Sequence, residues 1–226
     1  MRTYATYWEV ESEIKRDLKE LAVVYQSKSV QDMDVSNDPG YLTHELMNYT
    51  YSLIEPESAW EDLPERLEEY VTAEFAERMG PIHLNPGLSW KIDADYWQQF
   101  LHNGKFSYTY SERMVPYINA VKVLLQGNSE TRQAWLPIWH PDDLLSTGGD
   151  IRVPCSLGYH LMVRQGSLHL HYVMRSCDFI KHFRKDVVLA VLYQNFFRQL
   201  LQVSMGYFTH TIFSLHAFAK DLEGVF

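Results

Sequence analysis

Two clusters of reactive and polar residues flank a predicted hairpin within residues 152–186. Cys155 follows Pro154, whose ring fixes the backbone and removes an N–H donor, so the thiol is expected where an irregular segment enters a strand. Arg175 and Ser176 follow the second arm of the hairpin. A guanidinium presents a planar fork of donors that suits phosphate, and a neighbouring hydroxyl adds another donor. The pattern predicts a thiol nucleophile beside an anion site, where positive charge favours the thiolate.

The hairpin itself is predicted from polarity on both sides of a short polar turn. Apolar residues at 158–163 lead into the turn 164–167, and residues 168–174 alternate in polarity, as expected of a strand with one buried face. Antiparallel arms bring the chain back to the edge where it started. The hairpin therefore predicts that Arg175 lies near Cys155.

Composition limits the class of protein. At 226 residues, with 46% hydrophobic and 14% aromatic residues, the chain can bury a large core, and 1–226 is expected to form a single domain. No apolar run approaches the roughly 20 residues of a membrane span. The net charge of -9 argues against a broad nucleic-acid surface but permits a local basic pocket for one small phosphate. With two cysteines and no secretory signal at the amino terminus, a reducing cytoplasm is expected.

Hydrophobic periodicity predicts the elements that must position these residues. The segment after Asp186 is apolar on nearly all sides, which indicates a buried central helix. Pro137 indicates an edge or bulged strand. Helices are expected at 7–22, at 41–54, within the acidic stretch 55–77, in 106–126 and after residue 186, and strands at 23–25, 134–139 and 207–218.

Other reactive arrangements find less support. The chain contains no Gly-rich phosphate loop and no His-Glu-x-x-His motif, and its two cysteines are too few for a zinc ribbon. His169 and His171 share one face of a strand without a visible carboxylate or cysteine partner, so no metal site is predicted. A Cys–His protease would need a base near Cys155, and no oxyanion motif accompanies the late histidines His210 and His216.

Several short motifs, taken in order, resemble the thymidylate synthase family, which includes pyrimidine-nucleotide hydroxymethylases. They are Val-Pro-Cys155, Met-Arg175-Ser176-Cys177-Asp178, Asp186 and Ser-Leu-His216-Ala-Phe218. The resemblance extends from about Tyr41 to the carboxyl terminus. It implies a homodimeric α/β (α+β) three-layer fold with a large mixed sheet at the subunit interface. It also implies transfer of one carbon from 5,10-methylenetetrahydrofolate to C5 of a pyrimidine nucleoside monophosphate, without a membrane or nucleic acid.

The resemblance implies four catalytic residues. Cys155 resembles the nucleophile that adds to C6 of the base and makes C5 nucleophilic. Tyr110, in Tyr-Ser-Glu-Arg, resembles the active-site tyrosine, and Asp178 resembles the acidic residue that orders nucleotide and folate. Glu45, in His-Glu-Leu, resembles the glutamate that manages protons and water near the folate. Without the resemblance, Glu45 is interpreted as a solvated carboxylate at the edge of a helical stripe.

The resemblance also implies the nucleotide-binding residues. Arg175 and Ser176 match the phosphate-binding pair. Arg132 resembles the arginine that reaches the phosphate in the partner subunit, so each active site would need two chains. His216 matches the histidine that contacts the sugar hydroxyl.

Asp186 stands where members that use uracil carry an asparagine, whose amide accepts from N3–H and donates to O4. Cytosine reverses both partners. An aspartate can accept from the exocyclic amine, and a proton shared between its carboxyl and N3 completes the second bond. Members that act on dCMP show this replacement, so Asp186 favours cytosine. The alternative is an aspartate that caps the helix starting at Val187.

Further departures bear on the sugar and the product. Phe218 stands where the family usually has a tyrosine that holds the sugar, which leaves the choice between ribose and deoxyribose open. Ser156 replaces a frequent histidine and Met174 a frequent glutamine. The sequence ends soon after His216, without the tail that in many synthases closes over the folate, so water is expected to trap the methylene intermediate.

The leading hypothesis is a folate-dependent dCMP C5-hydroxymethylase of the kind that supplies modified cytosine for viral DNA, for example a phage protein in the host cytoplasm. A dCMP C5-methyltransferase and a short thymidylate synthase acting on dUMP are alternatives within the family. A non-catalytic nucleotide- or RNA-binding relative is the alternative of another class.

Overall fold

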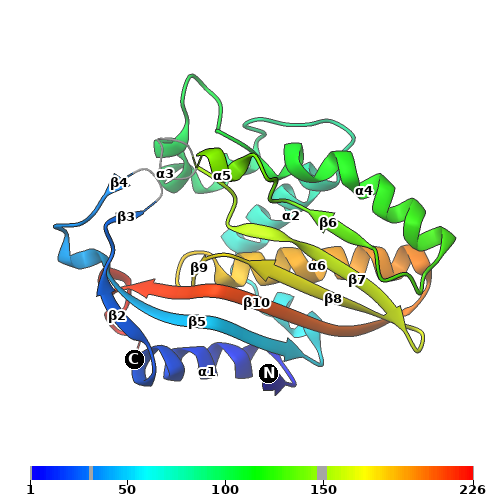
Figure 1. Cartoon of the computed structure of the whole chain (residues 1–226), viewed down its shortest axis with the longest axis horizontal. Helices are drawn as coiled ribbons and strands as arrows, with labels where there is room; N and C mark the ends of the chain where they lie inside the picture. The colour runs from blue at the N-terminus through cyan, green and yellow to red at the C-terminus, as the bar shows by residue number, and fades with distance from the viewer. Residues whose placement is uncertain (1, 31–32, 147–151, 226) are drawn as a thin grey trace.

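A large mixed β-sheet organises the chain (Figure 1). The computed structural model describes residues 2–30, 33–146 and 152–225, and within these ranges eight strands form the sheet in the order β1-β5-β10-β8-β7-β6, with β2 paired to β5 and β9 to β10. The strands are β1 (Arg2–Tyr4), β2 (Val23–Gln26), β5 (Leu42–Leu53), β6 (Trp135–Pro137), β7 (Ser156–Arg164), β8 (Ser167–Met174), β9 (Cys177–Asp178) and β10 (Ser204–Phe218). Two short strands, β3 (Ser29–Val30) and β4 (Met33–Asp34), pair separately. The parallel pairs β1–β5, β8–β10 and β9–β10 within an otherwise antiparallel sheet confirm the expected mixed sheet.

Helices cover one face of the sheet and build a second layer upon it. The helices are α1 (Tyr7–Glu20), α2 (Glu65–Met79), α3 (Ala94–Trp97), α4 (Tyr110–Gly127), α5 (Asp143–Ser146) and α6 (Phe183–Leu201). Helix α6 contacts β8 and β10, α1 contacts β5, and α2 and α4 pack against α6 (Figure 1). Between these layers α6 is buried around much of its circumference, which explains its nearly continuous apolar sequence. None of the described helices combines the length and the apolarity that crossing a bilayer requires.

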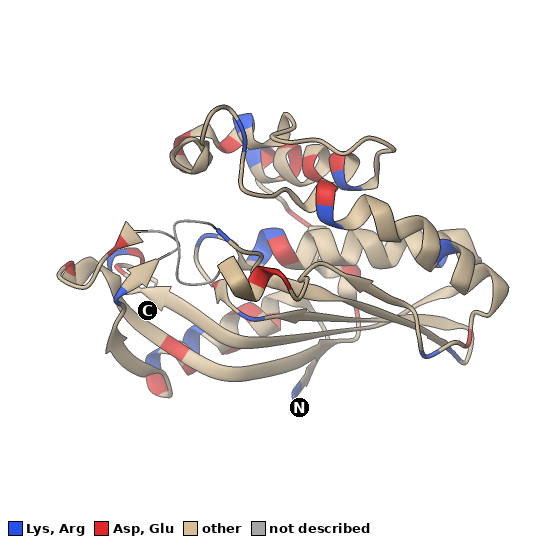
Figure 2. Cartoon of the chain, turned by 45° about the horizontal axis from the view of Figure 1, so that its top comes forward, with Lys and Arg blue, Asp and Glu red and all other residues tan. Residues whose placement is uncertain are grey.

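Charged side chains are concentrated on helices and loops (Figure 2). Neither β8 nor β10, which lie side by side in the sheet, contains a Lys, Arg, Asp or Glu. On β10 the buried Phe208 and Ile212 face the helices, whereas Tyr207 and Phe213 stay exposed on the opposite face. At β8 and β10 the sheet therefore has one packed face and one face with uncharged, partly apolar residues.

The predicted β-hairpin is confirmed. Strands β7 and β8 pair in antiparallel register from Arg164 and Ser167, with Gln165 and Gly166 between them. Both turn residues have positive φ, 50° and 74°, as a type I′ turn requires. The predicted edge strand is also confirmed, because β6, which contains Pro137, pairs with β7 alone among the described strands.

The helix predicted at 41–54 is wrong, because this segment forms the strand β5. Leucines at helical intervals suggested a helix, but the segment is also rich in Thr and Tyr, which favour strands. β5 pairs with β1 and β2 on one side and with β10 along nearly its whole length on the other. Tertiary pairing thus outweighed a local periodicity that fits either state. The other predicted helices form, although α2 begins only at Glu65.

Candidate active site

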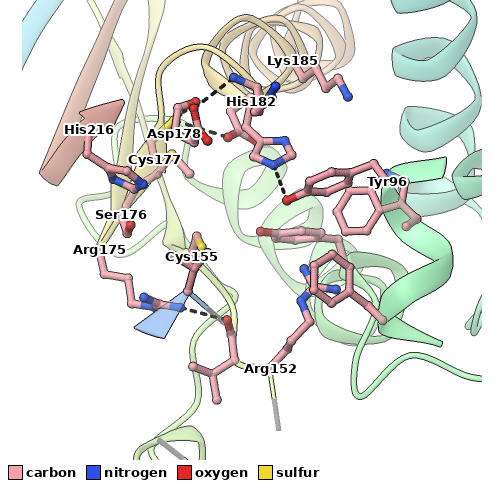
Figure 3. A pocket seen from close by; sticks show the side chains of 18 of the residues that line it. Tyr96, Arg152, Cys155, Arg175, Ser176, Cys177, Asp178, His182, Lys185 and His216 are labelled. Atoms are coloured by element: carbon pink, nitrogen blue, oxygen red, sulfur yellow. Dashed lines mark hydrogen bonds between the residues drawn. The ribbon is translucent and has the colours of Figure 1, made fainter. Parts of the chain in front are cut away.

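The carboxyl-terminal ends of β8 and β10 and the amino-terminal ends of α4 and α6 surround a cavity of about 830 Å³. A volume of this size accommodates a drug-sized ligand or more. Seven of the predicted site residues line the cavity, namely Tyr110, Asp186 and, as labelled in Figure 3, Cys155, Arg175, Ser176, Asp178 and His216. They come from segments that are up to about a hundred residues apart in the sequence, so the fold gathers them.

Cys155 is half-buried and directly precedes β7. The backbone N–H of Arg175 donates to the carbonyl of Cys155 at 2.8 Å, which confirms that the hairpin returns the chain to the cysteine. The Arg175 side chain reaches around the same loop, and its Nε donates to the Pro154 carbonyl at 2.8 Å and its Nη2 to the Val153 carbonyl at 3.1 Å (Figure 3). Arg175 therefore fixes the loop that carries the thiol while lining the cavity.

The thiolate of Cys155 is less favoured than the sequence suggested. Burial raises the pKa of Cys155, and the charge of Arg175 lowers it without cancelling the effect of burial. Arg152 acts in the same direction as Arg175, whereas Asp186 and Asp178 add to the effect of burial. The thiol is therefore mostly protonated near neutral pH.

Asp178 and His216 are brought together by strand pairing. β9 runs parallel to β10, with Asp178 opposite His216 in the register, and the Phe179 N–H donates to the His216 carbonyl at 2.7 Å. The Oδ1 atom of Asp178 accepts from the backbone N–H groups of Ile180 at 3.0 Å and Lys181 at 3.1 Å. Burial nevertheless raises the pKa of Asp178, with these hydrogen bonds opposing it. Its carboxyl is thus held rigidly at the cavity wall.

Asp186 lies in the first turn of α6 but does not cap it. The N-cap position is His182, and the Sγ of Cys177 is 3.7 Å from Asp186 Oδ2 as a weak donor. Burial raises the pKa of Asp186 to about 6, and the positive charge of Arg78 is the largest influence in the opposite direction. The carboxyl lines the cavity, so it is a titratable group that faces a ligand. The helix-cap interpretation of Asp186 therefore finds no support in its contacts.

Tyr110 begins α4 and lies between Thr109 and Glu112, which form a capping box at the start of this helix. Its hydroxyl lies 3.2 Å from Ser156 Oγ, which is 2.5 Å from the hydroxyl of Tyr172. This chain of three hydroxyls starts beside Cys155 and runs into the core. It holds the phenol of Tyr110 in one orientation at the cavity wall.

Glu45 and Arg132 do not line this cavity. Glu45 is on β5, where it accepts hydrogen bonds from the hydroxyls of Tyr25 and Ser214. The helical environment expected for Glu45 is wrong, and its contacts place it beside the cavity wall rather than in it. Arg132 is exposed just before β6, where its carbonyl lies 3.0 Å from His160 Nε2. Its contact with a partner subunit stays a prediction.

Two groups of cavity residues were missed by the sequence reasoning. One comprises Glu74, Glu77 and Arg78 of α2, which looked like part of a solvated acidic helix. The spacing of Tyr70, Glu74 and Arg78 by four residues was the available signal, since such residues share one face of a helix. The other group surrounds Arg152, whose guanidinium carbon lies within 4.3 to 5.7 Å of three ring centroids, those of Phe100, Trp97 and Tyr108 (Figure 3).

A half-buried histidine completes the aromatic side of the cavity. His182 Nε2 lies 2.8 Å from the hydroxyl of Tyr96 (Figure 3). Burial lowers the pKa of His182 to about 3, and the charges of Lys185 and Arg152 add to this effect. The imidazole is therefore uncharged near neutral pH and can only donate or accept a hydrogen bond there.

Comparison with known proteins gives a consistent family assignment. The family described as Thymidylate synthase matches residues 54–226. The "Putative thymidylate synthase" of Methanocaldococcus jannaschii is 25% identical over 184 residues, covering 69% of this chain and 83% of the relative. The "Bifunctional dihydrofolate reductase-thymidylate synthase" of Paramecium tetraurelia is 23% identical over 155 residues, covering 68% of this chain and 33% of the relative. The chain thus spans a third of that bifunctional protein.

Members of this family are one-carbon transferases that act on pyrimidine nucleotides as homodimers and use methylenetetrahydrofolate. The matched residues contain Cys155, the hairpin and the first turn of α6, so the match includes most of the residues that line the cavity described above. With a mixed sheet and a matched segment that covers most of its length, the chain belongs to the thymidylate synthase family.

Proposed function

We propose that the chain, as a single catalytic domain, is a deoxycytidylate C5-hydroxymethylase that uses methylenetetrahydrofolate. The observation that carries this proposal is the half-buried, titratable carboxyl of Asp186 at the cavity wall. Cytosine offers an exocyclic amine and an unprotonated N3, whereas uracil offers N3–H and O4. With a pKa of about 6, Asp186 can share its proton with N3 near neutral pH while it accepts from the amine.

The proposed chemistry starts at Cys155. Its thiolate forms a bond to C6 of the base, and the electron pair of the C5–C6 bond forms the new bond from C5 to the one-carbon unit. C5 then loses its proton as that carbon is released from the folate nitrogen, and water adds to the resulting exocyclic methylene. Tyr110, oriented by Ser156, is proposed to assist the departure of that proton. The bond between sulfur and C6 breaks at the end, which returns the thiol. Because the pKa of Cys155 is raised, we propose that contact with the substrate, rather than the empty site, favours its thiolate.

The residues of the cavity fit the nucleotide and the folate. Arg175 and Ser176 are proposed to hold the phosphate, and His216 the sugar. Methylenetetrahydrofolate supplies a carbon at the oxidation level of formaldehyde. The aromatic wall formed by Tyr96, Trp97, Phe100, Phe106 and Tyr108 fits its flat ring system, and Arg152, Lys181 and Lys220 fit its negative charge.

The hydroxymethyl product requires a water molecule at the reacting carbon. His182 and Tyr96 form a polar pair within the otherwise aromatic wall, and both line the cavity. An uncharged imidazole next to a phenol can hold a water molecule by hydrogen bonds without competing for the proton of Asp186. This pair supports hydroxymethylation over methyl transfer. Asp178 is proposed to order the two ligands from the opposite wall.

We also propose that the active form is a homodimer. The exposed Tyr207 and Phe213 on the face of the sheet away from the helices supply apolar area for a second copy. In that arrangement Arg132, exposed beside β6, would contribute to the phosphate site of the other copy. For Glu45, which lies outside the cavity, a role in proton transfer would need to act through Ser214.

Release of tritium from C5-labelled nucleotides tests the base preference, and the mass of the product tests the transferred group. We expect faster release from dCMP than from dUMP and a product that is heavier by a hydroxymethyl rather than a methyl group. A preference for dUMP in the wild-type protein would refute the proposed role of Asp186. Replacement Asp186→Asn is expected to shift the preference toward dUMP, since the amide donates to O4 and accepts from N3–H.

Covalent trapping of a substrate analogue distinguishes an enzyme from a non-catalytic nucleotide-binding protein. A 5-fluoropyrimidine nucleotide together with the folate should form a stable adduct with the wild-type chain, because fluorine at C5 cannot leave as a proton does. The variant Cys155→Ala should bind the nucleotide without forming the adduct. Binding without any adduct in the wild type would instead indicate a non-catalytic relative.

A further inference from the structure

A buried ion pair on α2 forms part of the cavity wall. Tyr70, Glu74 and Arg78 are spaced by one helical turn each and line the cavity together. The Arg78 side chain is only 4% exposed, and its Nε donates to Glu74 Oε1 at 2.7 Å. Glu74 Oε2 accepts in turn from Ser89 Oγ at 2.6 Å. Placing two charges in the interior usually costs more free energy than their attraction returns, so this pair calls for a functional explanation.

The guanidinium of Arg78 is held in a defined place. Its carbon lies 4.0 Å from the centroid of the Tyr110 ring, so it is fixed between the phenol and Glu74. Helix α2 packs against α6, which carries Asp186 in its first turn. Arg78 and Asp186 line the same cavity, and among the charges around Asp186 that of Arg78 has the largest effect.

Titratable groups on the elements around Asp186 also interact electrostatically with its carboxyl. Lys185 on α6 favours the ionised carboxyl, as does the hydrogen bond from Cys177 on β9, whereas Glu74 on α2 disfavours it. The carboxyl of Asp186 also has weaker electrostatic interactions with six further groups. These are Tyr51 on β5, Tyr70 on α2, Tyr110 on α4, Cys155 before β7, Tyr159 on β7 and Tyr172 on β8. Arg78 and Lys185 are thus the cations of this group. Lys185 forms an ion pair with Asp93 at 2.5 Å. Arg78 is the more deeply buried of the two cations.

We propose that Arg78 is a positioning residue that determines base specificity, because its charge keeps the carboxyl of Asp186 ionised, the form that pairs with cytosine protonated at N3 and cannot donate to O4 of uracil. This inference rests on the proposed function and extends it. Arg78 does not contact the base in this role. It acts through Asp186, which does.

The chemistry of the two bases explains why the place of the proton matters. A neutral carboxylic acid has one donor and one acceptor, so it can pair with cytosine through N3 and the amine, or with uracil through O4 and N3–H. An ionised carboxylate has acceptors only, and it matches cytosine protonated at N3, which presents two donors. It cannot donate to O4 of uracil. A site that keeps Asp186 ionised therefore excludes uracil, and a site that keeps it neutral accepts both bases.

Protonation of N3 also assists the reaction itself. A positive charge on the ring draws electrons from C6, the atom that the Cys155 thiolate attacks. Loss of Arg78 should therefore lower kcat for dCMP as well as the preference for dCMP over dUMP. A residue that only stabilised the fold would change neither the preference nor the pH profile.

The test compares substrate preference and pH profiles in matched variants. In Glu74→Gln/Arg78→Met both charges of the pair are removed, so no buried carboxylate is left without its partner. We expect the pH at which kcat/KM for dCMP changes to rise by about one unit, and the preference for dCMP to fall about tenfold, since one pKa unit is a factor of ten. Arg78→Lys keeps the charge and is expected to restore most of the preference.

Two further variants keep the test decisive. Glu74→Gln alone removes the carboxylate that opposes ionisation of Asp186, so its pH profile should move to lower pH, opposite to the double variant. In an Asp186→Asn background, Arg78→Met should leave the ratio of dCMP to dUMP activity unchanged. If the double variant fails to fold, the direction in which the pH profile of Glu74→Gln shifts decides between a role of the ion pair in base specificity and a purely structural role.

The results that overturn the inference differ from those that overturn the proposed function. An unchanged preference and pH profile in Glu74→Gln/Arg78→Met, or a shift of Glu74→Gln to higher pH, would exclude the role of Arg78 while leaving the hydroxymethylase intact. Wild-type protein that prefers dUMP would instead exclude the proposed function itself. Circular dichroism of each variant checks that the fold is kept.

Discussion

The half-buried carboxyl of Asp186 predicts that the variant Asp186→Asn is more stable than the wild type at neutral pH. Burial raises the pKa of this group from 3.8 to about 6, a shift of about two units. One unit corresponds to about 1.36 kcal/mol, so the shift amounts to about 3 kcal/mol of destabilisation above both pKa values. Because the carboxyl opens into a cavity that water can enter, about 1 to 2 kcal/mol is the expected gain. Asparagine removes the charge at nearly constant volume.

The pH dependence follows from the sign of the shift. A carboxyl whose pKa is higher in the folded than in the unfolded chain contributes stability that is fully present below about pH 4 and is lost as the pH rises through about 6. The difference between Asp186→Asn and the wild type should thus be largest above about pH 7 and should vanish below about pH 4. Urea unfolding followed by circular dichroism at several pH values measures this difference.

Asp93 supplies a control of opposite sign. Burial opposes its ionisation, but the hydrogen bond and the charge of Lys185 outweigh burial and lower the pKa of Asp93. Its contribution to stability is present at neutral pH and is lost as the pH falls through the lowered pKa, so Asp93→Asn should destabilise the protein at neutral pH. If Asp186→Asn proved less stable than the wild type at about pH 8, or if its effect were the same at all pH values, the electrostatic reasoning would be refuted.

Two further predictions concern other buried groups. Iodoacetamide should modify Cys155 slowly near neutral pH, because burial raises the pKa of its thiol, and the reaction should become faster as the pH rises past the ordinary pKa range of a thiol. The variant Arg175→Gln should slow the reaction further, because it removes the positive charge that opposes the effect of burial. Cys177, which is 3% exposed, serves as an internal control that stays unmodified in the folded chain, and equal rates at both cysteines would contradict this prediction. Burial lowers the pKa of His210 to about 3, so stability is lost as the pH falls from about 6.5 toward that value. The variant His210→Phe can keep the stacking on Tyr172, whose ring centroid lies 4.7 Å away. In an acid titration followed by circular dichroism, His210→Phe should unfold at lower pH than the wild type. An acid midpoint that is unchanged or higher in His210→Phe would show that other groups control acid unfolding.

The sequence was most informative where structure depends on neighbouring residues. The hairpin was predictable because Gln165 and Gly166 occupy a turn whose geometry depends on local chemistry, and antiparallel arms then necessarily bring Arg175 to Cys155. The edge position of β6 followed from Pro137, which lacks a donor. The segment from Cys155 to Asp186 thus emerged as the candidate site before the fold was known.

Tertiary structure decided what local pattern left ambiguous. The periodicity of residues 42–53 fits a helix or a strand, and only pairing with β10 and β2 makes it a strand, which places Glu45 outside the cavity. The carboxylate and the guanidinium that reach the cavity instead, Glu74 and Arg78, come from a helix whose sequence looks solvated, and packing against α6 buries them. The pKa shifts of Cys155 and Asp186 likewise depend on burial among distant segments, because desolvation is a property of the whole surroundings of a group and not of its neighbours in sequence.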